Sequence, residues 1–212
     1  MEIVSTNLGE AKTVEWNGKS IQTGIYKYPT HEPLLLENTD VANDAVIDRK
    51  HHGGLHKACY VFSTEHYPFW KEKYPNLDWQ WGMFGENLTV TQLDETKTYI
   101  GNIYNVGQAV VQISEPRQPC FKLGIRFKDQ NIIKEFLSHS GSGTYLRIIK
   151  KGIVKVGDVF ELKEEANIPL TIYDYYRLAT NQTKSKTIME LASLSKGLRA
   201  DKQLFYKNKL TK

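Results

Sequence analysis

Short runs of apolar and β-branched residues, separated by glycines, dominate the first 165 residues of the chain. Residues 13–16 and 19–23 flank Asn17-Gly18, a dipeptide that tolerates positive φ and suits the tight turn of a β-hairpin. Many short strands broken by glycine turns favour a barrel over a parallel sheet with regular crossover helices. The pattern predicts a mainly β fold, a closed or nearly closed β-barrel with a few short helices. The further runs that support it lie at residues 57–62, 99–104, 109–113, 145–149 and 159–162.

Helical spacing of apolar residues replaces this pattern at a few places. Residues 65–74 follow Ser63-Thr64, which can cap a helix, and end before Pro75, and residues 131–138 place their apolar side chains on one side. Beyond a change of composition at residues 164–167, three more segments have helical spacing. We therefore predict two domains, a β-barrel over residues 1–165 and a small three-helix bundle over residues 166–212. The segments of the bundle are residues 170–179, 187–194 and 199–210.

Composition narrows the class of protein. With 212 residues, 40% of them hydrophobic and 25% charged, the chain is neither disordered nor fibrous, and it is long enough to bury a sizeable core. Two cysteines, Cys59 and Cys120, are too few for a disulfide framework and lack the spacing of a zinc or redox pair. The chain begins without a signal-peptide pattern and has no run of about 18 apolar residues. We expect a soluble cytoplasmic protein with no membrane partner.

The positive charge is concentrated at the C-terminus. Residues 181–212 contain eight lysines and arginines and two acids, which gives this tail a net charge of +6. The whole chain has a net charge of +4, so the rest of the chain is slightly acidic. Its helices faintly resemble a helix-turn-helix, which would allow nucleic-acid binding. The interleaved aromatic residues are more typical of a core or an interface, so we favour a solvated helical face that serves docking, partner recognition or the formation of a homodimer. Those aromatic residues are Tyr173, Tyr175, Tyr176, Phe205 and Tyr206.

Three segments combine glycines with reactive or charged side chains, and the first is residues 48–57. Adjacent glycines let the backbone approach a ligand, and the surrounding cations and histidines can hold an anion. His52 and His56 are also four residues apart, as zinc ligands on one helical face would be, but Gly53-Gly54 makes a helix there improbable. An anion or cofactor loop is the favoured interpretation, with a polar turn as the alternative. The residues it would use are Arg49, His52, Gly53, Gly54 and Lys57.

The second segment, residues 82–89, and the third, residues 115–122, add a proton carrier and a thiol. Near Gly85, Glu86 could exchange a proton and the Asn87 amide can donate and accept hydrogen bonds, although a strand-entry turn explains this segment nearly as well. Arg117 and Lys122 flank Cys120 in sequence, and proximity to both would favour its thiolate, which a nucleophile or a soft-metal ligand requires. Cys59, among apolar neighbours, is expected to be a core residue.

These segments, in this order, resemble the MOSC family, the domain named after the C-terminal part of molybdenum-cofactor sulfurases. The similarity is greatest to its stand-alone bacterial branch, whose small C-terminal domain the helical tail resembles. The resemblance implies a β-barrel-like fold that binds a molybdopterin cofactor, with Cys120 as the protein ligand of molybdenum. The loop from Arg49 to Lys57, the turn from Gly85 to Asn87, and Arg117 with Lys122 would then surround the pterin. The matching residues are 23–27, 48–57, 82–89, 114–122, 143–147 and 157–158.

The activity implied by this resemblance is reduction of small N-hydroxylated compounds such as hydroxylaminopurines. The metal would remove the N-bound oxygen, an external electron-donor protein would return two electrons, and Glu86 or His52 would supply protons. The alternative is a carrier that delivers the cofactor, or sulfur as a persulfide on Cys120, without reductase turnover. Pyridoxal phosphate binding is implied only at the family level, because sulfurases join this domain to another part that the 212 residues are not expected to include.

Overall fold

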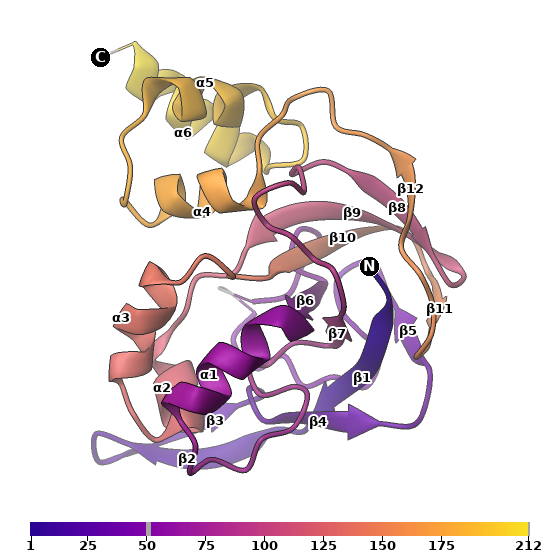
Figure 1. Ribbon diagram of the computed structural model, residues 1–212, viewed down its shortest axis with the longest axis vertical. Helices are drawn as coiled ribbons and strands as arrows, with labels where there is room; N and C mark the ends of the chain where they lie inside the picture. Colours follow the sequence, from indigo (N-terminus) through magenta and orange to yellow (C-terminus); the bar gives the residue numbers. More distant parts are fainter. Residues whose placement is uncertain (50–51, 212) are drawn as a thin grey trace.

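The computed structural model describes residues 1–49 and 52–211. Its main element is one large β-sheet (Figure 1). Eight strands are hydrogen-bonded in the order β12-β8-β9-β10-β6-β7-β1-β4. All neighbours are antiparallel except β6 and β7, which are parallel, so the sheet is mixed. The strands are β1 (Ile3–Gly9), β4 (Lys27–Thr30), β6 (Cys59–Ser63), β7 (Leu88–Val90), β8 (Ile103–Val106), β9 (Ala109–Pro116), β10 (Thr144–Lys150) and β12 (Glu161–Glu164).

The mainly β class is confirmed, but no closed barrel is found. β12 and β4 form the two edges of the sheet, and no ladder joins them within residues 1–49 and 52–211. An isolated bridge between Glu2 and Val159 instead connects the start of β1 to the segment that precedes β12. The sheet therefore curves back on itself without closing, which matches the glycine-punctuated pattern of short strands but not full closure.

Two smaller sheets accompany the large one. The hairpin of β2 (Lys12–Trp16) and β3 (Lys19–Thr23) confirms the predicted turn, because Asn17 and Gly18 have φ of 48° and 71°. β5 (Leu34–Leu36) pairs with β11 (Gly152–Val154). Sequence patterning did not reveal β1, β4, β5, β7 or β11. β1, for example, buries Ser5, Thr6 and Asn7, so apolar and polar residues do not alternate along it.

Three α-helices and one 3-10 turn cover one side of the sheet. The turn η1 (Thr64–His66) and the helix α1 (Tyr67–Lys73) confirm the helix predicted at residues 65–74, and α3 (Asn131–Ser138) has the predicted bounds. α2 (Phe121–Phe127) was not expected, since a glycine interrupts its seven residues. These helices share an aromatic core with β6. Its fully buried aromatic members are Phe62, Tyr67, Trp70, Phe84, Phe127 and Phe136.

The C-terminal helices pack against one end of the sheet (Figure 1). They are α4 (Ile172–Ala179), α5 (Lys186–Leu194) and α6 (Ala200–Leu210), close to the predicted segments. Tyr175 and Leu198 belong to the same buried hydrophobic cluster as Ile113 and Leu146 of the sheet. The boundary at residue 165 stays a prediction. Among the helices described, none combines the length and the apolar character needed to cross a membrane.

Gly197 tests how closely the helical unit is attached to the sheet. A Cβ atom added there would lie 2.5 Å from the backbone nitrogen of Gly101, so backbone atoms would have to move. We expect Gly197→Ala to lower the free energy of unfolding by about 2 kcal/mol in urea titrations. Gly157→Ala, which meets nothing within 4 Å but requires a φ of 89°, is the control and should lose only about 1 kcal/mol. Equal stability of Gly197→Ala and wild type would contradict the close approach.

Candidate functional site

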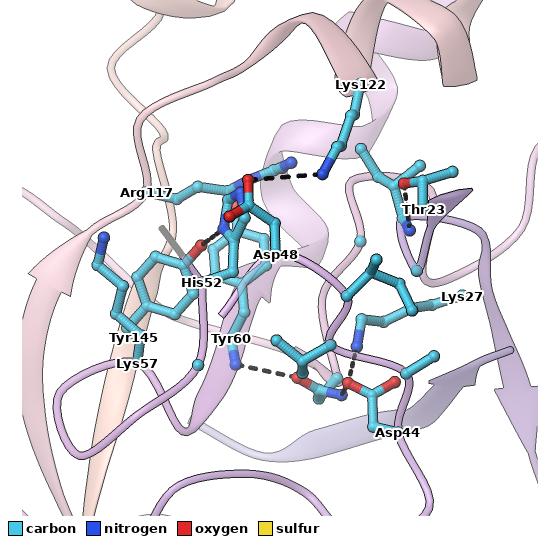
Figure 2. A pocket seen from close by; sticks show the side chains of 18 of the residues that line it. Thr23, Lys27, Asp44, Asp48, His52, Lys57, Tyr60, Arg117, Lys122 and Tyr145 are labelled. Atoms are coloured by element: carbon cyan, nitrogen blue, oxygen red, sulfur yellow. Dashed lines mark hydrogen bonds and ion pairs between the residues drawn. The ribbon is translucent and has the colours of Figure 1, made fainter. Parts of the chain in front are cut away.

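A cavity of about 650 Å³, counting its open mouth, lies beside the large sheet (Figure 2). The loops after β3, before β6 and after β9 meet there, together with Tyr60 of β6 and Tyr145 of β10. Residues of the three predicted segments that line it are Asp48, His52, Gly53, Lys57, Gly85, Asn87, Arg117, Cys120 and Lys122.

The Cys120 thiol belongs to this cavity. Cys120 lies between the last residues of β9 and the first residue of α2, is partly exposed, and lines both the cavity and a neighbouring groove. Cys59, in contrast, is 1% exposed within β6, and burial raises the pKa of its thiol. The structure therefore distinguishes the two cysteines as the sequence predicts: one faces a cavity and the other is part of the core.

Arg117 places a buried positive charge in the wall. Its side chain is 4% exposed, donates a hydrogen bond to the carbonyl oxygen of Phe84, and has its guanidinium carbon 5.0 Å from the centroid of the Tyr60 ring. Burial acts to lower the pKa of the guanidinium, but nearby Tyr60, Tyr145 and Cys120 outweigh it, so this pKa is raised. No carboxylate forms an ion pair with Arg117 in the described part of the chain. The wall thus holds a permanent cation suited to an anionic ligand.

Two lysines add to this charge. Lys122 Nζ is 3.7 Å from the Asp48 carboxylate, and Lys57 Nζ is 5.5 Å from the centroid of the Tyr145 ring. Burial lowers the pKa of Lys57, and the nearby Glu115 carboxylate opposes the shift. Arg117, Lys57 and Lys122 therefore all line the cavity (Figure 2).

His52 points into the same space, where its Nδ1 is 3.2 Å from the Tyr145 hydroxyl (Figure 2). Burial, together with the charges of Arg117 and Lys57, lowers the pKa of His52 to about 4. The imidazole is therefore neutral near pH 7 and can accept or donate a hydrogen bond, but it is not a store of protons at that pH.

The floor of the cavity contains a polar network that sequence reasoning did not identify. Asp44 forms an ion pair with Lys27, and its carboxylate accepts hydrogen bonds from Asn87 Nδ2 at 3.0 Å and from the Gly9 backbone nitrogen at 3.0 Å. Asn87 Oδ1 accepts a hydrogen bond from the Tyr60 backbone nitrogen at 3.2 Å. The network joins β1, β4, β6 and the segment between β5 and β6, so Asn87 supports the floor. Asp44 lies in a polar stretch with no motif, and nothing in the sequence singled it out.

Three predicted site residues are not part of the lining. Arg49 is exposed and pairs with Asp40 at 2.8 Å, and Gly54 lies beside the lining residue Gly53. Glu86 is fully buried and accepts hydrogen bonds from Tyr67 and from Thr89 at 2.9 Å. These bonds occupy its carboxylate and favour a structural role over the proton transfer predicted for it. Residues 50 and 51 of the first segment lie outside the described residues.

The lining suits a flat anionic cofactor with a soft metal. Cys120 offers a sulfur ligand, the cations match phosphate, and Tyr60 and Tyr145 provide aromatic surface. Gly85 adopts a φ of 79°, and a Cβ added there would lie 3.2 Å from Ile25 Cγ1, where it would crowd the wall. The residues present therefore fit a molybdopterin-type group.

The protein is an open mixed sheet with a cavity lined by Arg117, Lys57, Lys122 and Cys120, and comparisons with known proteins identify its family. The family model of the MOSC domain matches residues 48–161. YflK of Bacillus subtilis, an uncharacterized protein, is 36% identical over 93% of this chain and 91% of its own length. The chain therefore belongs to the MOSC family, a domain associated with the molybdenum cofactor.

Two further similarities bear on structure and activity. The crystal structure of YiiM from Geobacillus stearothermophilus is similar with a TM-score of 0.81, at 28% identity over 99% of this chain and 98% of that one. A protein of Gibberella moniliformis named "Reductase" is 35% identical over 69% of this chain. The match covers only 27% of the length of that longer protein. The fold is thus shared along nearly the whole chain, and the family includes a protein named as a reductase.

The depressed pKa of His52 predicts a pH dependence of stability. The unfolded state takes up a proton near pH 6.5 and the folded state only near pH 4, so the stabilisation is complete above pH 6.5 and lost as the pH falls towards 4. We expect wild type to lose about 3 kcal/mol more than His52→Gln between pH 7 and pH 4. Denaturant titrations of both proteins measure this difference. Parallel pH profiles would contradict the shift.

The buried ion pair between Lys27 and Asp44 predicts that removal of one of the two charges strongly destabilises the protein. Lys27 and Asp44 have side chains that are 8% and 2% exposed, and removal of one partner leaves the other charge buried. We expect Asp44→Asn to lower the free energy of unfolding by about 3 kcal/mol in urea. Asp94→Asn, which breaks the exposed pair with Lys97, is the matched control and should change it by less than about 1 kcal/mol. Similar losses in both variants would argue against a special role for the floor.

Proposed function

We propose that this protein is a molybdenum-cofactor-dependent reductase of N-hydroxylated compounds. The observation that carries the proposal is the Cys120 thiol, which opens into a cavity lined by Arg117, Lys57 and Lys122. Family membership supports the cofactor, and the name of the Gibberella relative supports a reductive activity. A purely structural cysteine needs neither an adjoining cavity nor cations around it.

The chain's own residues would divide the binding of the cofactor among them. Cys120 would supply the protein sulfur to molybdenum, and Arg117 and Lys122 would bind the anionic part of the pterin. Gly53 and Gly85 keep the walls free of side chains at two points. When bound, the cofactor supplies two-electron redox chemistry, which amino-acid side chains do not provide.

The overall reaction converts R–NH–OH, two electrons and two protons into R–NH2 and water. The N–O bond breaks, nitrogen is reduced, and the departing oxygen leaves as water. A separate electron-donor protein would supply the electrons. Neutral His52, held against the Tyr145 hydroxyl, would orient the substrate by hydrogen bonding, while the protons would come from solvent through the open mouth. Glu86, which accepts hydrogen bonds beneath the wall, is not assigned a proton in this scheme.

Replacement of the proposed ligand tests the function directly. With 6-hydroxylaminopurine as substrate and a chemical electron donor, we expect Cys120→Ser, produced in a host that makes the cofactor, to lose at least about 10³-fold in kcat. Cys59→Ala is the matched control, because it removes the other thiol from the core and should leave turnover per folded molecule unchanged.

Two results would contradict the proposal. Undiminished turnover by Cys120→Ser would exclude this thiol as the required ligand. A wild-type protein that carries molybdenum by elemental analysis, shows no turnover and loses its cofactor to an acceptor protein would instead be a carrier.

A further inference from the structure

A groove adjoins the cofactor cavity and extends towards the C-terminal helices. It encloses about 1,280 Å³, counting its open side, and shares Cys120, His52 and Tyr145 with the cavity. Its other wall combines Glu115 of β9 with residues of the helical unit, which packs against β9 (Figure 1). The helical residues in that wall are Tyr175, Arg199 and Lys202. Cys120 therefore lies where the two spaces meet.

Glu115 is the unusual residue of the groove. It is 7% exposed, and its Oε1 atom is buried without a hydrogen-bond donor among residues 1–49 and 52–211. The nearest cations are Arg199, with Nε 3.6 Å from Oε1, and Lys57, with Nζ 4.0 Å from Oε2. Both distances exceed those of hydrogen bonds. A buried acceptor without a donor is unfavourable, which is why such groups in proteins usually have a partner or bind one.

Arg199 does not donate a hydrogen bond to Glu115 in this arrangement. Its Nε donates to Asp201 Oδ1 at 3.0 Å, and its Nη2 donates to Asp201 Oδ2 at 2.7 Å. This bidentate pair fixes the guanidinium so that it offers Glu115 charge rather than a hydrogen bond. Arg199 is therefore a positioning residue, and Glu115 keeps an unused acceptor at the groove.

We propose that this groove is the substrate compartment, and that Glu115 selects substrates that carry an N–H group next to the N–O bond by accepting a hydrogen bond from it. Tyr145 and Tyr175 line the groove and offer aromatic surface to a flat ring. The inference rests on the proposed function and adds Glu115 as a residue that determines specificity for a free N–H beside the N–O bond. It also gives the C-terminal helices a role, since they complete the wall around Glu115.

The test compares two substrates that differ in one group, 6-hydroxylaminopurine and its derivative methylated on the hydroxylamino nitrogen. In wild type we expect a preference for the N–H compound in kcat/KM. In Glu115→Gln, which removes the charge but keeps the size, we expect this preference to fall about tenfold, through KM rather than kcat. Lys207→Gln is the control, because this exposed lysine of α6 is not part of the groove, and it should retain the wild-type preference.

A binding measurement separates this inference from the proposed function. Calorimetric titration of the cofactor-loaded protein compares adenine, whose 6-amino group can donate an N–H, with 6-dimethylaminopurine, whose 6-nitrogen has no hydrogen. This measurement needs no turnover. Weaker adenine binding by Glu115→Gln, in a protein without reductase activity, would support the groove and reject the reductase. Glu115→Gln keeps an amide oxygen that can accept a hydrogen bond, whereas Glu115→Leu has no acceptor. An unchanged preference in both variants, in turnover or in binding, would overturn the role of Glu115 even if Cys120→Ser is inactive.

Discussion

The buried charge of Arg117 is the constraint on which the site depends. A buried guanidinium without a carboxylate partner is costly, and Arg117, 4% exposed, has none among residues 1–49 and 52–211. The Phe84 carbonyl, the Tyr60 ring and the Phe136 ring surround it instead. Phe84 and Phe136 belong to the aromatic core beneath α1, α2 and α3. Packing of the small aromatic core therefore holds the Arg117 guanidinium in the wall of the cavity, where an anionic ligand can reach it.

The polar floor solves a related problem on the other side of the cavity. Asp44 and Lys27 neutralise one another, and Asn87 and the Gly9 backbone satisfy further hydrogen bonds of the carboxylate. The floor therefore adds no net charge, whereas the wall does. A ligand that bears negative charge would be drawn to Arg117, Lys57 and Lys122 rather than to the floor, which orients it within the cavity.

Sequence patterns predicted what depends on local interactions. The Asn17-Gly18 hairpin and α3 follow from turn chemistry and helical spacing, and Cys120 was distinguished from Cys59 by its neighbours in sequence. What was missed depends on contacts between distant segments. Asp44 becomes part of the floor only because β1 and Asn87 lie beside it. The role predicted for Glu86 stays a prediction, and the structure adds that its carboxylate accepts hydrogen bonds from Tyr67 and Thr89. Closure of the barrel likewise depends on pairing between the two edge strands, which no local pattern specifies.

The basic C-terminal tail acquires a more specific interpretation from its place in the fold. Sequence alone favours a solvated face, yet Arg199 and Lys202 line the groove beside Cys120, and Gly197 lies close to the backbone of the sheet. Because the helices share a hydrophobic cluster with the sheet, packing fixes the backbone that carries these two side chains. Arg199 at that position places a positive charge 3.6 Å from the Glu115 carboxylate without a hydrogen bond to it. The helical unit therefore forms part of the groove wall and also packs against the sheet.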